Sequence, residues 1–161
     1  MPVDQDAARL RDHCAVDRGS GSLHLPNWIL DDWVAFLAVA RNVDLGSTQV
    51  LMREGQAQNS LLIVVGGGLE VRAGIQGDAF GPLRRERFGA VIGEISFFDG
   101  GARSATVWAT EPTRLVELHR AAVMAFAAQR PARGIELFCA LGQVLAWRVR
   151  RNEADRGAGA R

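Results

Sequence analysis

The chain has no lysine, so all nineteen of its basic residues are arginine. Lysine forms the Schiff bases of many carbonyl enzymes and contacts phosphate in lysine-containing phosphate loops. Both kinds of chemistry are therefore excluded. The formal net charge over 161 residues is +1, which provides no general electrostatic field for binding nucleic acid or an anionic membrane.

Cysteine and histidine are also scarce. Cys14 and Cys139 lie far apart and match no metal-binding spacing. We expect two free thiols in a reducing compartment, although a disulfide stays open from the sequence alone. The histidines form no His-x-His pair and lie outside the central apolar runs: His13, His24 and His119. With no metal-binding pattern and no motif for Ser-His-Asp catalysis, the sequence favours a protein that is neither an enzyme nor a metal binder.

Long apolar runs are missing as well. The most apolar stretch near the N-terminus, residues 25–40, is interrupted by Asp31 and Asp32. The first residues mix acidic and basic side chains without an apolar core. We therefore expect no signal peptide, no membrane insertion and a cytoplasmic location.

The length and the apolar content of 48% are those of one globular domain. Residues 1–24 are mostly polar and include the run Gly19-Ser20-Gly21-Ser22, which is typical of a flexible segment. We expect a flexible leader over 1–24, a domain over 25–153 and a flexible tail over 154–161.

Short runs rich in Val, Leu, Ile and Thr occupy the middle of the chain, and turn signals such as 66-GGG-68 and 99-DGG-101 separate them. Several short strands at this spacing predict a β-sandwich or β-barrel. The predicted strands are 48–53, 60–65, 68–73, 104–109 and 113–119.

Helical periodicity flanks the strands on both sides. Apolar residues between Trp28 and Ala40 recur at helical spacing. After the strands, helices are predicted over Ala121–Gln129 and Gly134–Asn152, with a break at Pro131. The second of these has an apolar stripe at steps of four residues: Leu137, Leu141, Leu145 and Val149.

Two segments are rich in arginine. The loop 74–88 contains Arg84, Arg85 and Arg87, and the chain from Arg130 onward has a net charge of +4. We interpret both as solvated basic segments. The alternatives are a surface for an acidic partner in the loop, and contact with nucleic acid or an acidic surface in the tail.

The stretch 92–106 combines groups that bind anions. A short helix beginning near Glu94 would present free N–H groups at its start, and Arg103 offers a planar guanidinium to a phosphate. Glu94 is only an acceptor, which suits a sugar hydroxyl. From chemistry alone, a weak surface ion pair between Glu94 and Arg103 is an equal alternative.

The motif resembles the phosphate-binding cassette of cyclic nucleotide-binding domains, the family that includes the catabolite activator protein and the regulatory subunits of cAMP-dependent protein kinase. The cassette stands as Gly93-Glu94-Ile95-Ser96-Phe97-Phe98 and Arg103-Ser104-Ala105-Thr106. Weaker matches lie at 50–55, 62–71 and 114–118. The resemblance covers about residues 25–150 and implies a mainly β barrel or jelly roll with an N-terminal helix, a short cassette helix and two C-terminal helices.

The resemblance also implies roles for residues. Glu94 would accept the ribose 2′-hydroxyl, Arg103 would pair with the cyclic phosphate, and backbone N–H groups near Ser96 and Ser104 would complete the phosphate site. We expect cAMP ahead of cGMP, with the Ser104 hydroxyl keeping cGMP as a ligand. The full expected set is Gly93, Glu94, Ile95, Ser96, Arg103, Ser104 and Ala105. The candidates for a lid over the base are Phe138, Gln143 and Trp147, and helix packing is the interpretation that we favour for each.

No helix-turn-helix module follows the last predicted helix, so we expect no dedicated DNA-binding domain. The chain is interpreted as a nucleotide sensor that acts on an effector protein in trans or as a homodimer, with a hinge between Pro131 and Gly134. The alternative is a degenerate domain that has kept its fold for protein contacts and binds no nucleotide.

Overall fold

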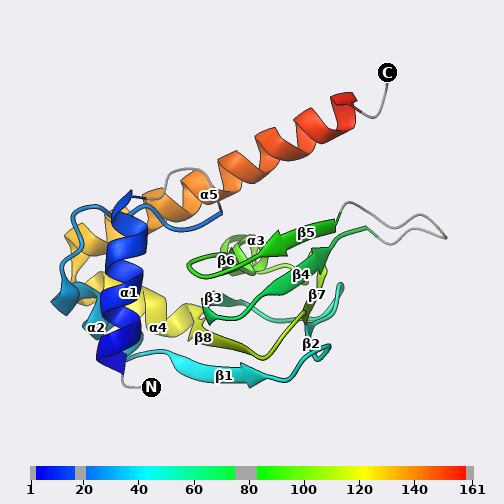
Figure 1. Ribbon diagram of the computed structural model, residues 1–161. Coiled ribbons are helices and arrows are strands. Elements are labelled where there is room, and N and C mark those ends of the chain that lie inside the picture. The colour runs from blue at the N-terminus through cyan, green and yellow to red at the C-terminus, as the bar shows by residue number, and fades with distance from the viewer. Residues whose placement is uncertain (1–2, 17–20, 75–82, 159–161) are drawn as a thin grey trace.

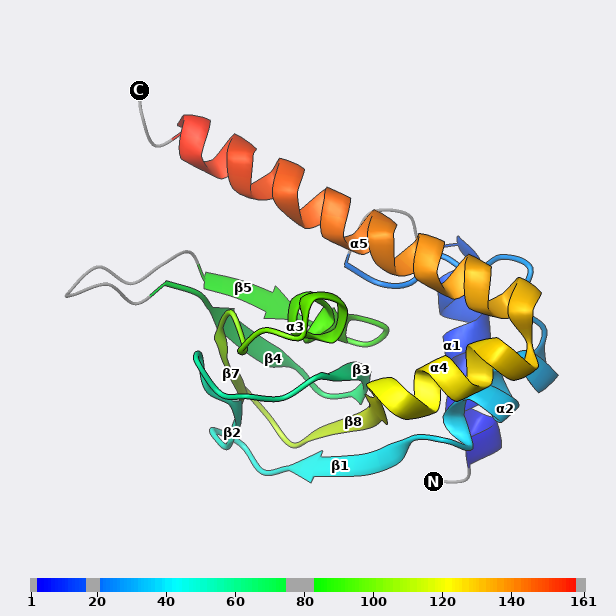
Figure 2. The ribbon, with the colours of Figure 1, turned by 180° about the vertical axis from the view of Figure 1, so that it is seen from behind.

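Two antiparallel sheets lie beside a group of helices in the computed structural model, which describes residues 3–16, 21–74 and 83–158 (Figures 1 and 2). The first sheet has the order β1 (Arg41–Leu45), β8 (Thr113–His119), β3 (Ser60–Gly66), β6 (Val91–Ile92). The second has the order β2 (Val50–Met52), β7 (Thr106–Ala109), β4 (Leu69–Arg72), β5 (Leu83–Glu86). In the described part of the chain no strand belongs to both sheets. The expected mainly β fold is therefore confirmed as a two-sheet jelly roll, without a closed barrel.

Strand β3 is buried on both faces, which explains its uninterrupted apolar run. Leu61, Ile63 and Val65 pack in the core beneath the helices. Leu62 and Val64 point the other way, into the core between the two sheets. Because successive side chains of a strand alternate between faces, one strand supplies both cores.

The helices gather at one end of the sheets and along one side. The short helix α3 lies beneath α5 in Figure 2. Three helices confirm predicted ones: α2 (Leu30–Leu37), α4 (Arg120–Gln129) and α5 (Pro131–Ala158). A fourth helix, α3 (Glu94–Asp99), forms the helical part of the expected cassette.

Helix α2 and the residue Trp28 before it contact the junction between α4 and α5. The ring of Trp28, just before α2, lies 5.6 Å from that of Phe126 on α4. The buried carboxylate of Asp32 accepts a hydrogen bond from Arg130 at 3.0 Å and pairs with Arg133 at 2.9 Å. Aromatic packing and a buried ion-pair cluster thus fix the point at which α5 begins.

The expectation of a flexible leader is wrong for the described residues. Helix α1 (Val3–Val16) packs against α2, with Ala7 and Leu10 fully buried and Cys14 1% exposed. These three residues are spaced by three and four, so they form one helical face within a mostly polar segment. Residues 17–20 lie outside the described part of the chain.

The tail also differs from the expectation. Helix α5 continues through Ala158, whereas a flexible segment was expected from residue 154; residues 159–161 are not described. The predicted stripe is correct only at its start, because Leu137 and Leu141 are fully buried while Val149 is 55% exposed. A helix has 3.6 residues per turn, so each step of four residues drifts by about 40° around the axis.

Three strands were not expected from the sequence. Strands β1, β5 and β6 have short or strongly polar sequences, such as Leu83-Arg84-Arg85-Glu86 in β5. The segment taken as a solvated basic loop therefore contains an edge strand paired with β4. Residues 75–82 of that loop are outside the described residues.

Candidate functional site

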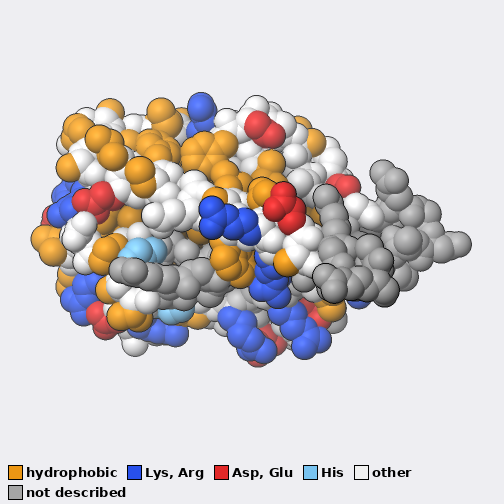
Figure 3. All heavy atoms as spheres, turned by 90° about the horizontal axis from the view of Figure 1, so that it is seen from above, with side chains coloured by type: hydrophobic (Ala, Val, Ile, Leu, Met, Phe, Trp, Pro, Cys, Tyr) orange, Lys and Arg blue, Asp and Glu red, His pale blue; other side chains and the backbone are white. Residues whose placement is uncertain are grey.

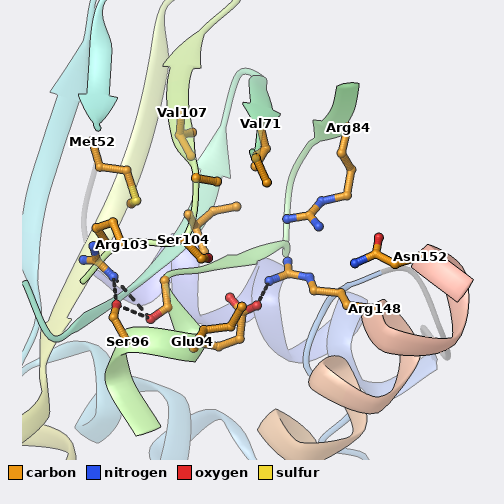
Figure 4. Close-up of a pocket in the computed structure, with 15 residues that line it drawn as sticks. Met52, Val71, Arg84, Glu94, Ser96, Arg103, Ser104, Val107, Arg148 and Asn152 are labelled. Atoms are coloured by element: carbon orange, nitrogen blue, oxygen red, sulfur yellow. Dashed lines mark hydrogen bonds and ion pairs between the residues drawn. The ribbon is translucent and has the colours of Figure 1, made fainter. Parts of the chain in front are cut away.

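A cavity of about 270 Å³ lies between α3, the second sheet and the C-terminal half of α5 (Figure 4). Its volume is near the lower end of small-molecule pockets, roughly 300 Å³. Met52, Val71 and Val107 form an apolar wall above a polar floor. All residues that the sequence predicted as ligand-binding line this pocket: Gly93, Glu94, Ile95, Ser96, Arg103, Ser104 and Ala105.

Glu94 occupies the middle of the floor. Gly93 precedes it with a φ of 84°, a left-handed conformation that turns the chain from β6 into α3. Glu94 is 3% exposed, and its side chain forms an ion pair with Arg148 of α5. Arg148 also donates a hydrogen bond to the carbonyl oxygen of Val91 at 2.5 Å. Glu94 thus connects the pocket floor to α5.

Arg103 lies at one end of the pocket floor and is 2% exposed. Its backbone is hydrogen-bonded to the turn after β2, because the N–H of Arg103 donates to the carbonyl oxygen of Gln56 at 2.9 Å. Its Nη1 donates to the carbonyl of Ser60 at 2.9 Å and to Oγ of Ser96 at 2.8 Å. Its Nε has no hydrogen-bond partner among the described residues. A buried guanidinium with a free donor is suited to an anionic ligand.

The proposed alternative of a Glu94–Arg103 surface ion pair is wrong. Both side chains are buried, and Glu94 pairs with Arg148 instead. Burial lowers the pKa of the Arg103 guanidinium below its ordinary value, while the negative charges of Glu117 and Glu94 act in the opposite direction. The pocket therefore has an acceptor and a donor at separate positions on its floor.

Ser104 lies next to Arg103 on the pocket lining and is exposed, as is Ile95 of α3. Ser96 is 1% exposed, and its hydroxyl bridges Arg103 and the carbonyl of Gly93, to which it donates at 3.2 Å. Ser96 thus supports the arginine, whereas Ser104 is an exposed residue of the pocket lining.

Polar residues that were not predicted occupy the far end of the pocket. Arg84 of β5 and Asn152 of α5 lie there beside Arg148 (Figure 4). Arg84 forms an ion pair with Glu86, which also pairs with Arg148 at 3.5 Å. Burial, followed by the charge of Arg148, lowers the pKa of Arg84. Burial raises the pKa of Glu86 against the opposing effect of Arg148 and Arg84.

A signal for Arg148 was present in the sequence. The buried face of α5 includes Leu137, Leu141 and Val144, and Arg148 follows four residues later on the same face. An arginine on an apolar face indicates a buried partner. Arg84 has no comparable signal, because only the pairing of β5 with β4 brings it to the pocket.

The three candidates for a lid do not line the pocket. Phe138 packs beside the ring of Phe98 at 6.3 Å, and Gln143 is exposed. The guanidinium of Arg151 lies 5.2 Å from the centre of the Trp147 ring. The residues of α5 that face the cavity are Arg148 and Asn152.

The chain belongs to the cyclic nucleotide-binding domain family, whose sequence model matches residues 43–130. The match includes the cassette helix α3 and Arg103, so the resemblance stated from the sequence is confirmed. A search of curated proteins gave no match.

Solved structures show the same fold. A cyclic nucleotide-binding domain from Methylobacillus flagellatus KT is 23% identical, with a TM-score of 0.82, over 99% of this chain and 86% of that one. The catabolite activator protein of Thermus thermophilus is 22% identical, with a TM-score of 0.73, over 83% of this chain and 61% of that one. The N-terminal domain of a Streptomyces coelicolor A3(2) transcriptional regulator is 24% identical, with a TM-score of 0.63, over 81% and 88%.

The described residues contain neither a membrane-spanning helix nor a cluster of metal-binding side chains. Among residues 3–16, 21–74 and 83–158, no helix has both the length and the apolarity needed to cross a membrane. Within the same residues no cluster of three His, Cys, Asp or Glu side chains could hold a metal ion. Cys14 is buried and Cys139 is exposed, and no disulfide joins them.

Proposed function

We propose that the protein is a cyclic nucleotide sensor, which binds cAMP or cGMP in the pocket and signals through α5 to a partner in the cytoplasm. The observation that carries this proposal is the separation of Glu94 and Arg103 along one buried floor. A cyclic nucleotide has a sugar with a free 2′-hydroxyl and a phosphate with one negative charge. An acceptor and a cation at separate positions match that pair of groups.

In this proposal Arg103 pairs with the cyclic phosphate and Glu94 accepts the ribose 2′-hydroxyl. Gly93, Ile95, Ser96, Ser104 and Ala105 form the rest of the binding surface, with backbone N–H groups near the two serines directed to the phosphate. Loss of a buried partner of a ligand charge costs about 2–5 kcal/mol. That range corresponds to a factor of roughly 30 to several thousand in affinity.

The base is expected at the end of the pocket opposite Arg103, beside Arg84, Arg148 and Asn152. The sequence led us to expect cAMP ahead of cGMP. Arg84 and Arg148 are donors, and guanine presents two acceptors, O6 and N7, that match an arginine in other recognition settings. The proposal therefore keeps both nucleotides, and the titration below decides between them.

Signalling is proposed to begin at Glu94, because its carboxylate would contact both the ribose hydroxyl and Arg148 of α5. It pairs with Arg148 of α5, so a ribose hydroxyl at Glu94 changes the contact that holds the C-terminal half of the helix. The face of the molecule seen in Figure 3 has exposed apolar side chains. On α5, Ile135 is 66% exposed and Val149 is 55% exposed. These exposed apolar side chains favour the binding of a partner to α5, either an effector protein or a second copy of the chain.

The proposal is tested by calorimetric titration of the protein with cAMP and with cGMP. We expect micromolar or tighter binding that is weakened in Arg103→Ala by a factor of roughly 30 to several thousand. Arg85→Ala is the matched control, since Arg85 is an exposed arginine paired with Glu70 outside the pocket. No binding of either nucleotide, checked by an unchanged unfolding temperature, would favour the alternative, a degenerate domain that serves as a protein-interaction module.

Signalling through α5 has its own test. Amide hydrogen exchange of residues after Gln129 should slow when nucleotide is added, because the ligand changes the contacts of α5. Unchanged exchange in this region, under conditions in which calorimetry shows saturation, would contradict the helical signal and leave nucleotide binding intact.

A further inference from the structure

Glu117 is a buried carboxylate with no part in the proposed ligand contacts. It lies on β8, on the same face as Leu115, which packs in the core between the two sheets. Its side chain is 2% exposed, and it is not part of the pocket lining. A carboxylate at such a position is costly unless every oxygen is hydrogen-bonded.

Both oxygens of Glu117 have partners on neighbouring strands. Oε2 accepts hydrogen bonds from Nε of Arg41 at 3.1 Å and from Nη2 at 2.5 Å. Arg41 is the directly opposite residue on β1. Oε1 accepts from the hydroxyl of Ser60 at 2.8 Å and from the side-chain amide of Gln58 at 2.6 Å. The carboxylate therefore joins β1, β8 and the start of β3.

Ser60 connects this carboxylate to Arg103. The Ser60 side chain is fully buried, and its Oγ accepts a hydrogen bond from Nη2 of Arg103 at 2.9 Å. A hydroxyl has one proton, and here it is donated to Glu117. The lone pairs of Oγ are thereby left for donors, among them the guanidinium of Arg103. Glu117 thus fixes the orientation of the hydroxyl that holds Arg103.

The negative charge of Glu117 also stabilises the Arg103 guanidinium, in addition to the hydrogen bonds through Ser60. The Glu117 charge opposes the effect of burial on the pKa of Arg103, and it does so ahead of Glu94. Glu94 is also engaged by Arg148 and lines the cavity. Glu117 is therefore a counter-charge of Arg103 that lies outside the pocket lining.

We propose that Glu117, acting through Ser60, is a positioning residue that holds the Arg103 guanidinium in place for an anionic ligand. The inference rests on the proposed function for its effect on nucleotide affinity. The positioning itself is a property of the ligand-free protein and can be measured without any nucleotide.

The first experiment follows the Nε–Hε signal of Arg103 in the ¹H–¹⁵N NMR spectrum of the ligand-free full chain. The signal is assigned by its loss in Arg103→Ala. We expect it to broaden or shift in Glu117→Gln, which keeps the size of the side chain and removes its charge. The matched control is Glu70→Gln, which removes a carboxylate paired with Arg85 outside the pocket and should leave the signal unchanged. An unchanged Arg103 signal in Glu117→Gln would overturn the proposal.

The second experiment measures nucleotide affinity in a double-mutant cycle. Glu117→Gln should weaken binding about tenfold, the scale of one hydrogen bond to a charged group. The same substitution should cause no further loss in the Arg103→Ala background, because its effect passes through Arg103. An equal loss in both backgrounds would overturn the positioning role. If the wild type binds neither nucleotide, the proposed function fails and the NMR result alone decides the positioning role.

A third variant, Ser60→Ala, keeps the proposal testable if Glu117→Gln does not fold. Ser60→Ala removes the connecting hydroxyl and leaves the Glu117 charge with Arg41 and Gln58. If Glu117→Gln does not fold, as judged by thermal unfolding, Ser60→Ala should change the Arg103 signal in its place. A signal unaffected by Ser60→Ala would then contradict the proposal.

Discussion

Gly93 brings the backbone into direct contact with the guanidinium of Arg103. A Cβ atom at this position would lie 2.1 Å from Nη1 of Arg103 and 2.8 Å from the carbonyl oxygen of Ser60. Its φ of 84° is also one that other residues rarely adopt. The glycine is therefore required twice, by its conformation and by the close approach of the arginine that the cassette depends on.

At the residue scale we predict that Gly93→Ala is far more damaging than Gly100→Ala. Gly100 has a similar φ of 70° and no atom within 4 Å of the added Cβ, so it isolates the backbone cost. Gly100→Ala should lower the free energy of unfolding by about 1–2 kcal/mol. The clash should add about 1–3 kcal/mol in Gly93→Ala and displace Arg103. Denaturant unfolding and nucleotide titration measure both effects; equal losses for the two variants would contradict the contact argument.

At the element scale, α4 and α5 approach closely where they cross near Gly134. A Cβ atom on Gly134 would lie 2.6 Å from Cβ of Ala127 and 2.9 Å from its Cα. The same helix has a second glycine, Gly142, at which an added Cβ meets no atom within 4 Å. Gly134 is therefore required by helix packing, whereas no contact requires a glycine at position 142.

We predict opposite signs for alanine at these two positions. Gly134→Ala should destabilise the protein by about 1–3 kcal/mol, because the helices must separate to admit the methyl group. Gly142→Ala should stabilise it by up to about 1 kcal/mol, because alanine is the better helix former. Urea unfolding of both variants is the measurement, and a neutral Gly134→Ala would show that the helix pair adjusts freely.

At the scale of the whole molecule, arginine joins elements that are distant in the sequence. Arg114 of β8 donates to Asp6 of α1 at 3.0 Å. Arg130 binds Asp32 of α2, and Arg148 links α5 to the pocket. A guanidinium with five donors can bridge several acceptors at once, which an ammonium group does less well. The absence of lysine thus accompanies a fold that is held together by multivalent arginines.

The stability of the whole molecule should depend on pH through Glu117. Burial acts to raise the pKa of this carboxyl, but hydrogen bonds from Ser60 and Arg41, together with the charges of Arg41 and His119, outweigh it, so the pKa lies below the ordinary value of 4.5. A group with a lowered folded-state pKa stabilises the protein above its unfolded value, and this contribution is lost as pH falls through the folded value.

The difference in unfolding free energy between wild type and Glu117→Gln should therefore be constant near pH 6–7, where carboxylates are ionised. It should shrink as pH falls below about 4.5, the ordinary value. Denaturant unfolding between pH 3 and 7 provides the comparison. A difference that grows toward low pH would reverse the sign of the argument.

Some of the site could be read from the sequence, because the cassette is local. Gly93, Glu94 and Arg103 lie within eleven residues of one another, so a short motif contains the turn, the acceptor and the cation. Their presence in one pocket follows from β6, α3 and the turn before β7. The binding roles of these residues stay a prediction until the titrations are made.

Other parts of the site depend on contacts between distant segments. Ser60 and Glu117 are 57 positions apart, and neither differs in the sequence from an ordinary strand residue. Arg84 lies in a segment without apolar alternation, and α1 has only a short apolar face within polar surroundings. Strand pairing and helix docking bring these residues to their positions, and neither can be derived from local propensity.

The sequence by itself determined the cassette, the family and the order of the elements from α2 to α5 apart from β1, β5 and β6, because periodicity, turn residues and a contiguous motif are properties of neighbouring positions. Only the tertiary structure decided that Glu94 pairs with Arg148 instead of Arg103, and that Glu117 is a counter-charge of Arg103 outside the pocket lining. The physical reason is that a buried charge takes whichever partners the packing of distant elements brings within hydrogen-bond distance.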